Sequence, residues 1–267
     1  MTSGTVRVGV EAVALCGPGL PDWASSQRIL RGVEPYRARP IVLAPPAQLS
    51  PAERRRAIAS VKLALCVGTA CVAQSGLDPQ SLPAIFASSG ADGETIVAIL
   101  AALATPGREV SPTRFHNSVH NAPSGYWGIA AQSREAVTSV SGYDASFAAG
   151  LLEAAVQAVT GGRPVLLVAY DLPYPDPLHD ARRIEAGFGV AMVLRPAPSP
   201  GALAELHMTI GLGGEATRCV DDGLEPLRRG NPAARALPLL AVLAGRSAGA
   251  VHLELSHGML DVRVVPC

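Results

Sequence analysis

Asp144 stands where local structure most favours reactive chemistry in this sequence. A short β-branched run over residues 137–140 is followed by a turn over 141–144, and an Ala- and Leu-rich segment then predicts a helix from Ala145. A strand that enters a helix through a tight turn presents one side chain at the helix N-terminus, where free N–H groups favour negative charge or a nucleophile. Asp144 is that residue, and an aspartate there also suits a plain helix N-cap.

A second group of polar side chains precedes this turn, on a segment rich in small residues. His116 and His120 stand four residues apart, which places both on one face of the helix predicted over 111–127. The pair could ligate a metal ion, but no Glu or Cys follows at a fitting offset, so we expect no metal site. We interpret these histidines, with Asn117 and Asn121, as groups that pack and form hydrogen bonds at an interface.

The glycine-rich segments and the other histidines do not form a recognisable cofactor or catalytic motif. Gly211-Leu212-Gly213-Gly214 lacks the full spacing and the downstream acid of a dinucleotide fingerprint. Ser88-Ser89-Gly90 lacks the flanking glycine of a nucleophile elbow. We therefore expect no cofactor, and we interpret four further histidines as structural or solvated: His179, His207, His252 and His257.

The composition favours a cytoplasmic α/β protein that associates with another subunit. Hydrophobic residues make up 48% of the 267 residues and charged residues only 16%, so a monomer would expose large apolar patches. Lys plus Arg and Asp plus Glu number 22 each, which argues against a nucleic-acid partner. No leader-like segment opens the chain and no apolar run approaches membrane-spanning length, so we expect no membrane insertion.

The five cysteines show no CxxC pair and no regular spacing. Cys66 and Cys71 lie in an alternating apolar segment, and we interpret them as small core residues. The sequence therefore predicts neither a disulfide framework nor a zinc site.

Apolar runs that alternate with helical segments predict a layered α/β sheet with mixed strand pairing. The continuous apolar run 165–170 is typical of a strand covered on both faces. Residues 250–265 alternate in polarity, as in a β-hairpin around His257-Gly258.

Two helix starts have clear local signals. Asp92-Gly93-Glu94 predicts the start of a helix that runs to Leu103. Ser50 followed by Pro51 predicts a capped start, and the apolar spacing predicts that this helix continues through Leu65.

The segment 111–150 resembles, without gaps, part of the N-terminal half of β-ketoacyl synthases of the thiolase-like superfamily. The resemblance is carried by Ser111-Pro112, by Asn121 and Gly125, and by the strand Thr138-Ser139-Val140. The synthases begin a buried helix with their acyl-accepting cysteine at the position that Asp144 holds here. The run FHNSVHNAPSGYW is similar to short ketoacyl-synthase-like proteins of aryl-polyene-type pathways, which are described as chain length factors.

The resemblance implies a thiolase-like layered fold with a nearly complete N-terminal half and a truncated C-terminal half. Residues 1–212 would form an α/β domain like the N-terminal half of a synthase. Residues 213–267 would be a remnant of the second half, with a loop, one helix and the terminal hairpin, packed with the first part as one unit.

The resemblance also implies a subunit without catalytic activity. Condensation needs a thiolate that carries the acyl chain, and a carboxylate at Asp144 cannot do this because the mixed anhydride would be lost to water. We expect a heterodimer with a full-length β-ketoacyl synthase, in which this chain shapes the acyl tunnel and meets the acyl carrier protein through the complex. The implied interface and tunnel residues are Arg114, Phe115, His116, Asn117, His120, Asn121, Thr138, Ser139 and Val140.

Other interpretations stay open at this point. Phe115 either sets the depth of the partner's tunnel or packs in the core of this chain. An acyl hydrolase or acyltransferase on the same frame would use Asp144 with His116 or His120. A stand-alone scaffold or homodimer is the third interpretation.

Overall fold

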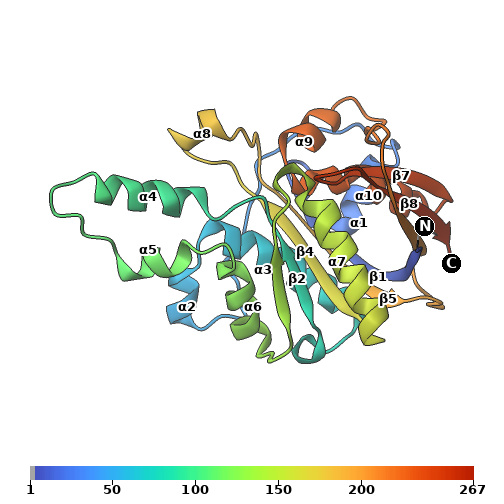
Figure 1. Ribbon diagram of the computed structural model, residues 1–267, viewed down its shortest axis with the longest axis horizontal. Coiled ribbons are helices and arrows are strands. Elements are labelled where there is room, and N and C mark those ends of the chain that lie inside the picture. Colours follow the sequence, from blue (N-terminus) through green and yellow to red (C-terminus); the bar gives the residue numbers. More distant parts are fainter. Residues whose placement is uncertain (1–3) are drawn as a thin grey trace.

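An eight-stranded mixed β-sheet runs through the described chain, residues 4–267 of the computed structural model (Figure 1). The strand order across the sheet is β3-β2-β4-β5-β1-β6-β8-β7. The first three strands of this order pair in parallel and the other neighbours pair antiparallel, which confirms the predicted mixed pairing. The strands are β1 (Val6–Cys16), β2 (Ala84–Ala87), β3 (Val137–Val140), β4 (Val165–Asp171), β5 (Phe188–Pro196), β6 (Ala204–Gly211), β7 (Gly249–Glu254) and β8 (Met259–Pro266).

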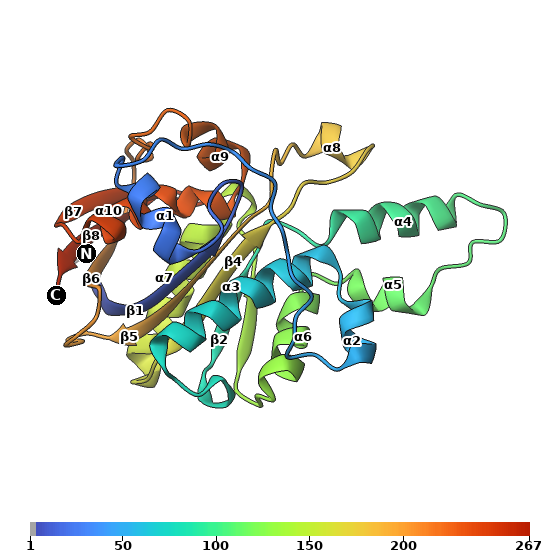
Figure 2. The ribbon, with the colours of Figure 1, turned by 180° about the vertical axis from the view of Figure 1, so that it is seen from behind.

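Helices cover both faces of the sheet (Figures 1 and 2). Helices α7, α10 and α1 lie on one side, here named the α7 face, and α3 and α6 lie on the other, named the α3 face. The α-helices are α1 (Trp23–Leu30), α2 (Pro51–Arg56), α3 (Ala59–Ser75), α4 (Gly93–Leu103), α5 (Pro112–Asn117), α6 (Ala122–Ala131), α7 (Ser146–Gly161), α8 (Leu178–Ala181), α9 (Glu225–Gly230) and α10 (Leu237–Gly245). Short 3-10 turns are η1 (Pro79–Ser81), η2 (Tyr143–Ala145) and η3 (Ala233–Ala236).

The central strand β4 is buried along its whole length, as its continuous apolar sequence predicts. Val165, Leu167 and Ala169 contribute to the core of the α7 face. The residues between them, Leu166 and Val168, contribute to the core of the α3 face. Because successive side chains of a strand point to opposite faces, both helical layers are needed to keep this strand from water.

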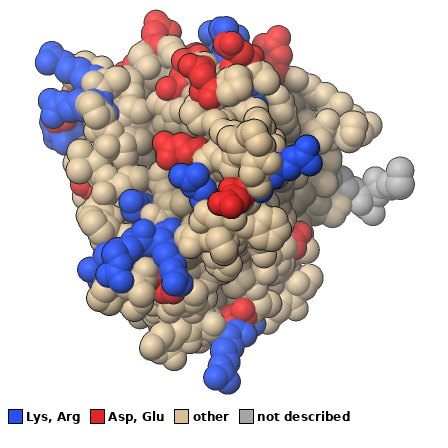
Figure 3. Space-filling view, turned by 90° about the vertical axis from the view of Figure 1, so that its left-hand side faces the viewer, with Lys and Arg blue, Asp and Glu red and all other residues tan. Residues whose placement is uncertain are grey.

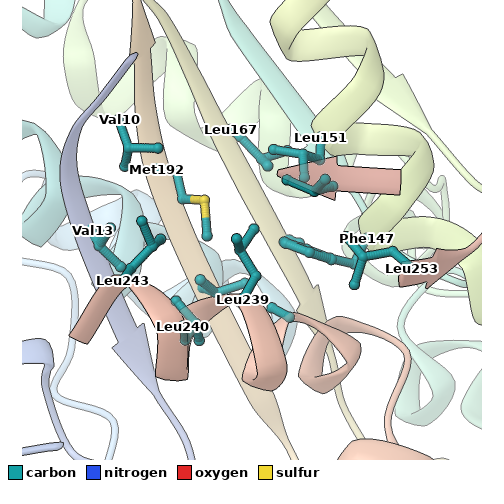
Figure 4. Close-up of a cluster of buried hydrophobic side chains, with 14 of the residues drawn as sticks. Val10, Val13, Phe147, Leu151, Leu167, Met192, Leu239, Leu240, Leu243 and Leu253 are labelled. Atoms are coloured by element: carbon teal, nitrogen blue, oxygen red, sulfur yellow. The ribbon is translucent and has the colours of Figure 1, made fainter. Parts of the chain in front are cut away.

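The core of the α7 face fixes where α7 lies (Figure 4). Gly150 of α7 lies so close to β2 that a Cβ atom there would be 2.6 Å from the Cβ of Ala87, so this position accepts only glycine without a shift. Leucines of α10 fill the remaining space over the sheet. Labelled residues of this core are Val10, Val13, Phe147, Leu151, Leu167, Met192, Leu239, Leu240, Leu243 and Leu253.

The single helix predicted over 111–127 is wrong, because the structure has two helices, α5 and α6, separated by residues 118–121. Pro123 lies in the first turn of α6. Proline cannot donate the backbone hydrogen bond that a continuous helix requires there, although it suits the start of a new helix. His116 therefore lies on α5 and His120 in the connection, and they do not share one helical face.

The helix predicted from Pro51 through Leu65 is also interrupted. Helix α2 ends at Arg56, and the extended backbone of Ile58 (ψ 171°) precedes α3. Cys66 belongs to α3 and is exposed, so its interpretation as a core residue is wrong, whereas Cys71 is buried as expected. The predicted helix ending at Leu103 and the terminal hairpin are confirmed as α4 and as the pair β7 and β8.

Candidate functional site

The turn between β3 and α7 presents Asp144 where α7 begins. The turn contains η2, and Tyr143 within it has a positive φ of 55°. The Ser146 hydroxyl accepts a hydrogen bond from the Gly142 amide (3.0 Å) and donates one to the Tyr143 carbonyl (2.7 Å), which holds the turn in shape. No side chain caps α7, so the interpretation of Asp144 as a plain helix cap is wrong.

Asp144 is held by two arginines from distant parts of the chain. Its Oδ1 lies 2.7 Å from Nη1 of Arg182, and its Oδ2 lies 3.2 Å from Nη2 of Arg235. The Arg182 guanidinium also covers the Tyr143 ring, with Cζ 3.7 Å from the ring centroid. Arg235 forms a further ion pair with Glu254 of β7. These five side chains, named here the elbow network, connect the start of α7 with the segment after β4, with η3 and with β7.

The elbow network sets the electrostatic character of the turn. Burial lowers the pKa of Arg182, but the hydrogen bond and charge of Asp144 outweigh burial, so that this pKa lies above its ordinary value. For Arg235 burial dominates and its pKa lies below the ordinary value, although Asp144 opposes the shift. Both groups are cationic at neutral pH, because a guanidinium is not deprotonated in proteins. The Asp144 carboxylate therefore faces two cationic partners at the start of α7.

The two histidines of the alternative chemistry are not brought to Asp144. Nε2 of His120 lies 3.0 Å from the carbonyl oxygen of Ser88. The His116 ring packs edge-to-face against Tyr126, with ring centroids 6.4 Å apart. Within residues 4–267, the ion-pair partners of Asp144 are the two arginines, and no hydrogen bond or ion pair joins it to either histidine. The same residues contain no group of three or more His, Cys, Asp or Glu side chains that could hold a metal ion.

The other predicted residues of the 111–121 region divide into structural and exposed positions. Asn117 is buried and its Nδ2 donates to the carbonyl oxygen of Arg56 (3.0 Å), which ties α5 to the end of α2. Asn121 precedes α6, and its carbonyl oxygen accepts from the Ser124 hydroxyl (2.8 Å). Arg114 lies on α5 and is exposed.

Strand β3 forms one edge of the sheet, and its backbone is paired on one side only. The Val140 carbonyl accepts from the Ser88 amide (3.2 Å), so Val140 directs its backbone polar groups toward β2. Because these groups alternate along a strand, Thr138 also faces β2, and the amides of Val137 and Ser139 face the open edge. An unpaired edge is a template for a strand of another chain.

The side chains of β3 connect this edge to both helical layers. The Thr138 hydroxyl accepts from Nε2 of Gln157 on α7 (3.2 Å). The Ser139 hydroxyl lies 3.1 Å from the Ser124 hydroxyl on α6. The edge is therefore held in place by the chain itself while its outward amides stay free for pairing.

Helices α4 and α5, with the loop between them, project from the body as an arm, residues 93–117 (Figure 1). Every residue of α4 after Thr95 is apolar, yet the buried residues of this helix are Gly93 and Thr95. Leu100 is 51% exposed and Phe115 of α5 is 68% exposed, so the interpretation of Phe115 as a core residue is wrong. A helix that is apolar all round is normally buried.

Figure 3 views the side from which the arm projects, where uncharged residues lie between several groups of charged side chains. Further large apolar side chains are exposed after the arm in the sequence, including Val119 at 49% and Ile129 of α6 at 53%. Although α4 is strongly apolar, no helix among the described residues is long and apolar enough to cross a membrane. Contiguous exposed apolar patches are typical of protein contact sites, so the arm is a candidate interface.

A buried carboxylate, Asp171, lies at the end of β4 beside the end of β2. Its Oδ1 accepts from the Ser89 amide (2.9 Å), the Ser89 hydroxyl (2.6 Å) and the Ser88 hydroxyl (3.2 Å). Its Oδ2 has no hydrogen-bond partner within the described part of the chain. Burial raises the pKa of Asp171 to about 6, against the opposing effect of the serine hydrogen bonds. Ser141 of the turn donates to the Ser89 carbonyl (3.3 Å), so this site joins the ends of three strands.

Sequence reasoning missed the partners of Asp144, because ion pairs between distant segments leave no local pattern. A weaker signal exists: Arg235 is the one charged residue of the otherwise apolar run 232–245. Asp171, likewise, directly follows the apolar run of β4. Burying a charged side chain costs free energy unless a partner of opposite charge or a hydrogen bond compensates it. A charge within an apolar run therefore predicts a contact with another part of the chain.

Comparison with known proteins gives one family match and several similar folds. Residues 22–224 match the family model described as beta-ketoacyl synthase, N-terminal domain. No curated protein sequence matches the chain.

Solved ketosynthase structures have the same fold. One is described as the ketosynthase ApeO in complex with its chain length factor ApeC from Xenorhabdus doucetiae; the similarity has a TM-score of 0.71 and 22% identity, and covers 96% of this chain and 99% of that chain. A second is described as AntDE:AntF, a type II PKS acyl-carrier protein in complex with its ketosynthase bound to the hexaketide, with a TM-score of 0.74, 13% identity and coverage of 99% and 100%. A third is described as a β-ketoacyl synthase from Burkholderia phymatum STM815. Its similarity has a TM-score of 0.59 and 14% identity, and covers 85% of this chain and 70% of that chain. The predicted thiolase-like α/β fold is confirmed.

Asp171→Asn is expected to gain stability relative to the wild type as the pH rises. The pKa of the Asp171 carboxyl is raised from 3.8 to about 6 in the folded chain. The protonated carboxyl therefore stabilises the folded state fully below pH 3.8, the pKa in the unfolded chain, and this stabilisation is lost as the pH rises through about 6. Between pH 4 and 8 the difference in unfolding free energy should change by roughly 2 kcal/mol in favour of the variant. Urea unfolding at several pH values measures it. The exposed Asp180→Asn is the control, and parallel pH curves for wild type and Asp171→Asn would contradict the prediction.

Proposed function

The chain belongs to the family of β-ketoacyl synthase N-terminal domains, and we propose that it is a non-catalytic, chain-length-factor-like partner of a full-length β-ketoacyl synthase. In this proposal the chain stabilises the synthase and shapes the tunnel for the growing acyl chain in polyene-, polyketide- or fatty-acid-type elongation. The acyl carrier protein meets it through the complex. The observation that carries the proposal is the ion-paired Asp144 at the position where the resemblance places the synthase nucleophile.

The surroundings of Asp144 support a role without condensation chemistry. Condensation requires a nucleophile that accepts an acyl group, keeps it from water and releases it again, as a thiolate does. An acyl group on Asp144 would displace the ion pairs with Arg182 and Arg235 and would form an anhydride that water attacks. The sequence contains no cysteine between Cys71 and Cys219, so the segment around Asp144 offers no thiol in place of the carboxylate.

The edge strand and the arm support the partner in the proposal. The free amides of β3 can extend the sheet into a second subunit, and the apolar side chains of α4 and α5 can be buried at the same time. An interface with both components has the character of an obligate contact. A solved structure with this fold is described as a ketosynthase in complex with its chain length factor, which favours a synthase as the second subunit.

The hydrolase or acyltransferase alternative requires Asp144 to act with His116 or His120. No observation favours it, since Asp144 is paired with arginines and the histidines contact Tyr126 and a backbone carbonyl. It nevertheless makes a distinct prediction, because it needs the Asp144 carboxylate for turnover.

Asp144→Ala is expected to leave product formation by the complex within about twofold of the wild type. The substitution should lower the free energy of unfolding by about 1–2 kcal/mol, since Arg182 and Arg235 lose their shared counterion at a site that is partly open to water. The assay is carrier-protein-dependent malonyl condensation by the chain purified with the synthase encoded beside it, and by the chain alone. Condensation by the chain alone, or loss of product in an intact Asp144→Ala complex, would contradict the proposal.

Ser139→Pro is expected to weaken the complex by at least about tenfold in dissociation constant, because proline removes an amide that faces the open edge. Ser139→Ala is the matched control, since it removes the same hydroxyl contact with Ser124 but keeps the amide. Gel filtration and titration calorimetry with the synthase measure association, and circular dichroism checks the fold. If the proline variant forms a heterodimer as stable as that of the alanine variant, β3 does not pair with the partner.

Phe115→Ala is expected to lengthen the products of the complex, and Phe115→Trp to shorten them, because the side chain at this position limits the space at the tunnel floor in the proposal. The chain itself should lose no more than about 0.5 kcal/mol of stability, since Phe115 is exposed in the free subunit. Mass spectrometry of carrier-bound products reads out the length. Leu103→Ala removes another apolar group of the arm, and equal lengthening by that control would assign the effect to a loosened interface instead.

A further inference from the structure

Two cysteines meet between β1 and α3, on the side of the sheet opposite the α7 face. Cys16 is the last residue of β1 and its side chain belongs to the core of the α3 face. Cys66 lies on α3 and is exposed. The Cys16 and Cys66 thiols are close enough for a hydrogen bond between them to be the main cause of the pKa shift of each. Both thiols are free in this structure.

The register of the sheet independently places these residues together. Cys16 pairs with Gly189 of β5. Leu63 and Val67 of α3 lie directly over Gly189, since a Cβ atom there would be 3.0 Å from Leu63 and 3.3 Å from Val67. Cys66 immediately precedes Val67 and follows Leu63 by three residues. It therefore lies beside these two residues on the surface of α3.

A second contact fixes the direction of α3 along β1. The buried Cys71 thiol lies against backbone groups of Ala14 and Val193, further from the end of β1 than Cys16. Helix α3 therefore runs against the direction of β1, and its earlier turns lie over the end of that strand. Both contacts agree with Cys66 at the Cys16 end.

The hydrogen bond makes the two thiols unequal. It raises the pKa of Cys16, together with burial and with the charge of Asp22, so Cys16 stays protonated. The same bond lowers the pKa of Cys66 to about 7 against the effect of burial. Other charged groups near the pair are Lys62, one turn earlier on α3, and two arginines of a cavity wall that includes Cys16: Arg37 and Arg39.

We propose that Cys16 and Cys66 are an oxidation site, in which a peroxide attacks at Cys66 and the pair then closes to an intramolecular disulfide. The Cys66 thiolate takes one peroxide oxygen, the O–O bond breaks, and hydroxide or alkoxide leaves. The Cys16 sulfur next displaces hydroxide from the Cys66 sulfenic acid, and the Cys16 proton leaves with that hydroxide as water. The two sulfurs lose two electrons in total, which the peroxide accepts.

The pair is open to small oxidants and lies away from the proposed partner surface. Cys66 is exposed, and the cavity lined by Cys16, Arg37 and Arg39 has a volume of about 440 Å3. Strands β2, β4 and β5 separate β1 from the open edge at β3. Figure 2 shows α3 across the sheet, with the arm projecting to one side. The oxidation site therefore does not depend on the proposed function.

The test treats the full chain with hydrogen peroxide, blocks free thiols with iodoacetamide and examines tryptic peptides by mass spectrometry. The expected product links peptide 8–28, which contains Cys16, to peptide 63–108, with fragmentation assigning the bond to Cys66 rather than Cys71. Dithiothreitol should release the link. Cys66→Ser should abolish it, and Cys267→Ser, at another exposed cysteine, should leave it unchanged. Separate alkylation of Cys16 and Cys66 in the oxidised wild type would overturn the proposal.

A second measurement follows the reactivity of Cys66 and does not require oxidation. Iodoacetamide labelling of Cys66 should be half-maximal near pH 7 in the wild type. In Cys16→Ala it should move to roughly pH 8.5, the ordinary value of a free thiol. An unchanged pH profile in that variant would show that the thiols are not in contact and would also overturn the proposal. If the Cys16→Ala variant does not fold, the linked-peptide experiment on the wild type decides whether the proposal holds.

Discussion

The structure depends on a sheet whose central strands are apolar on both faces. Neither face of β4 can meet water, so a helical layer is required on each side. This requirement draws α7 against one face, where Gly150 permits close contact with β2, and draws α3 against the other. The short strand β3, which precedes α7, lies at the edge of the sheet. The turn between β3 and α7 therefore lies at this edge and at the start of the helix.

The charges at that turn are paired between distant segments of the chain. Asp144 neutralises two guanidiniums, Glu254 contributes a second carboxylate, and the Tyr143 ring covers one guanidinium. The Asp144 carboxylate has its partners, whereas Nη2 of Arg182 and Nε of Arg235 are buried without a hydrogen-bond partner among the described residues. The turn therefore has the backbone form of a strand-to-helix elbow, and its aspartate is held in ion pairs with residues far away in the sequence.

The features with local causes could be predicted from the sequence. The start of α4 is one, since the Asp92 carboxylate accepts from the Thr95 amide (2.9 Å) within the same turn. The break before Pro123 also has a local cause, but the small-residue spacing of 111–127 conceals it. The arginine partners of Asp144 and the contact of Cys16 with Cys66 arise only when the fold brings distant segments together. No period or motif encodes such contacts, so the sequence predicts the turn at Asp144 but not the side chains that surround it.

The place of β1 in the sheet has a consequence for how the chain reaches its fold. Val8 pairs with Pro196 of β5 and with Leu206 of β6, so β1 is synthesised well before either of its neighbours. Closing contacts over roughly 190 residues carries a large entropy cost before any hydrogen bond is gained, and folding dominated by such contacts is slow. During synthesis the apolar β1 therefore stays unpaired until the segments of β5 and β6, roughly 190 residues later, have emerged.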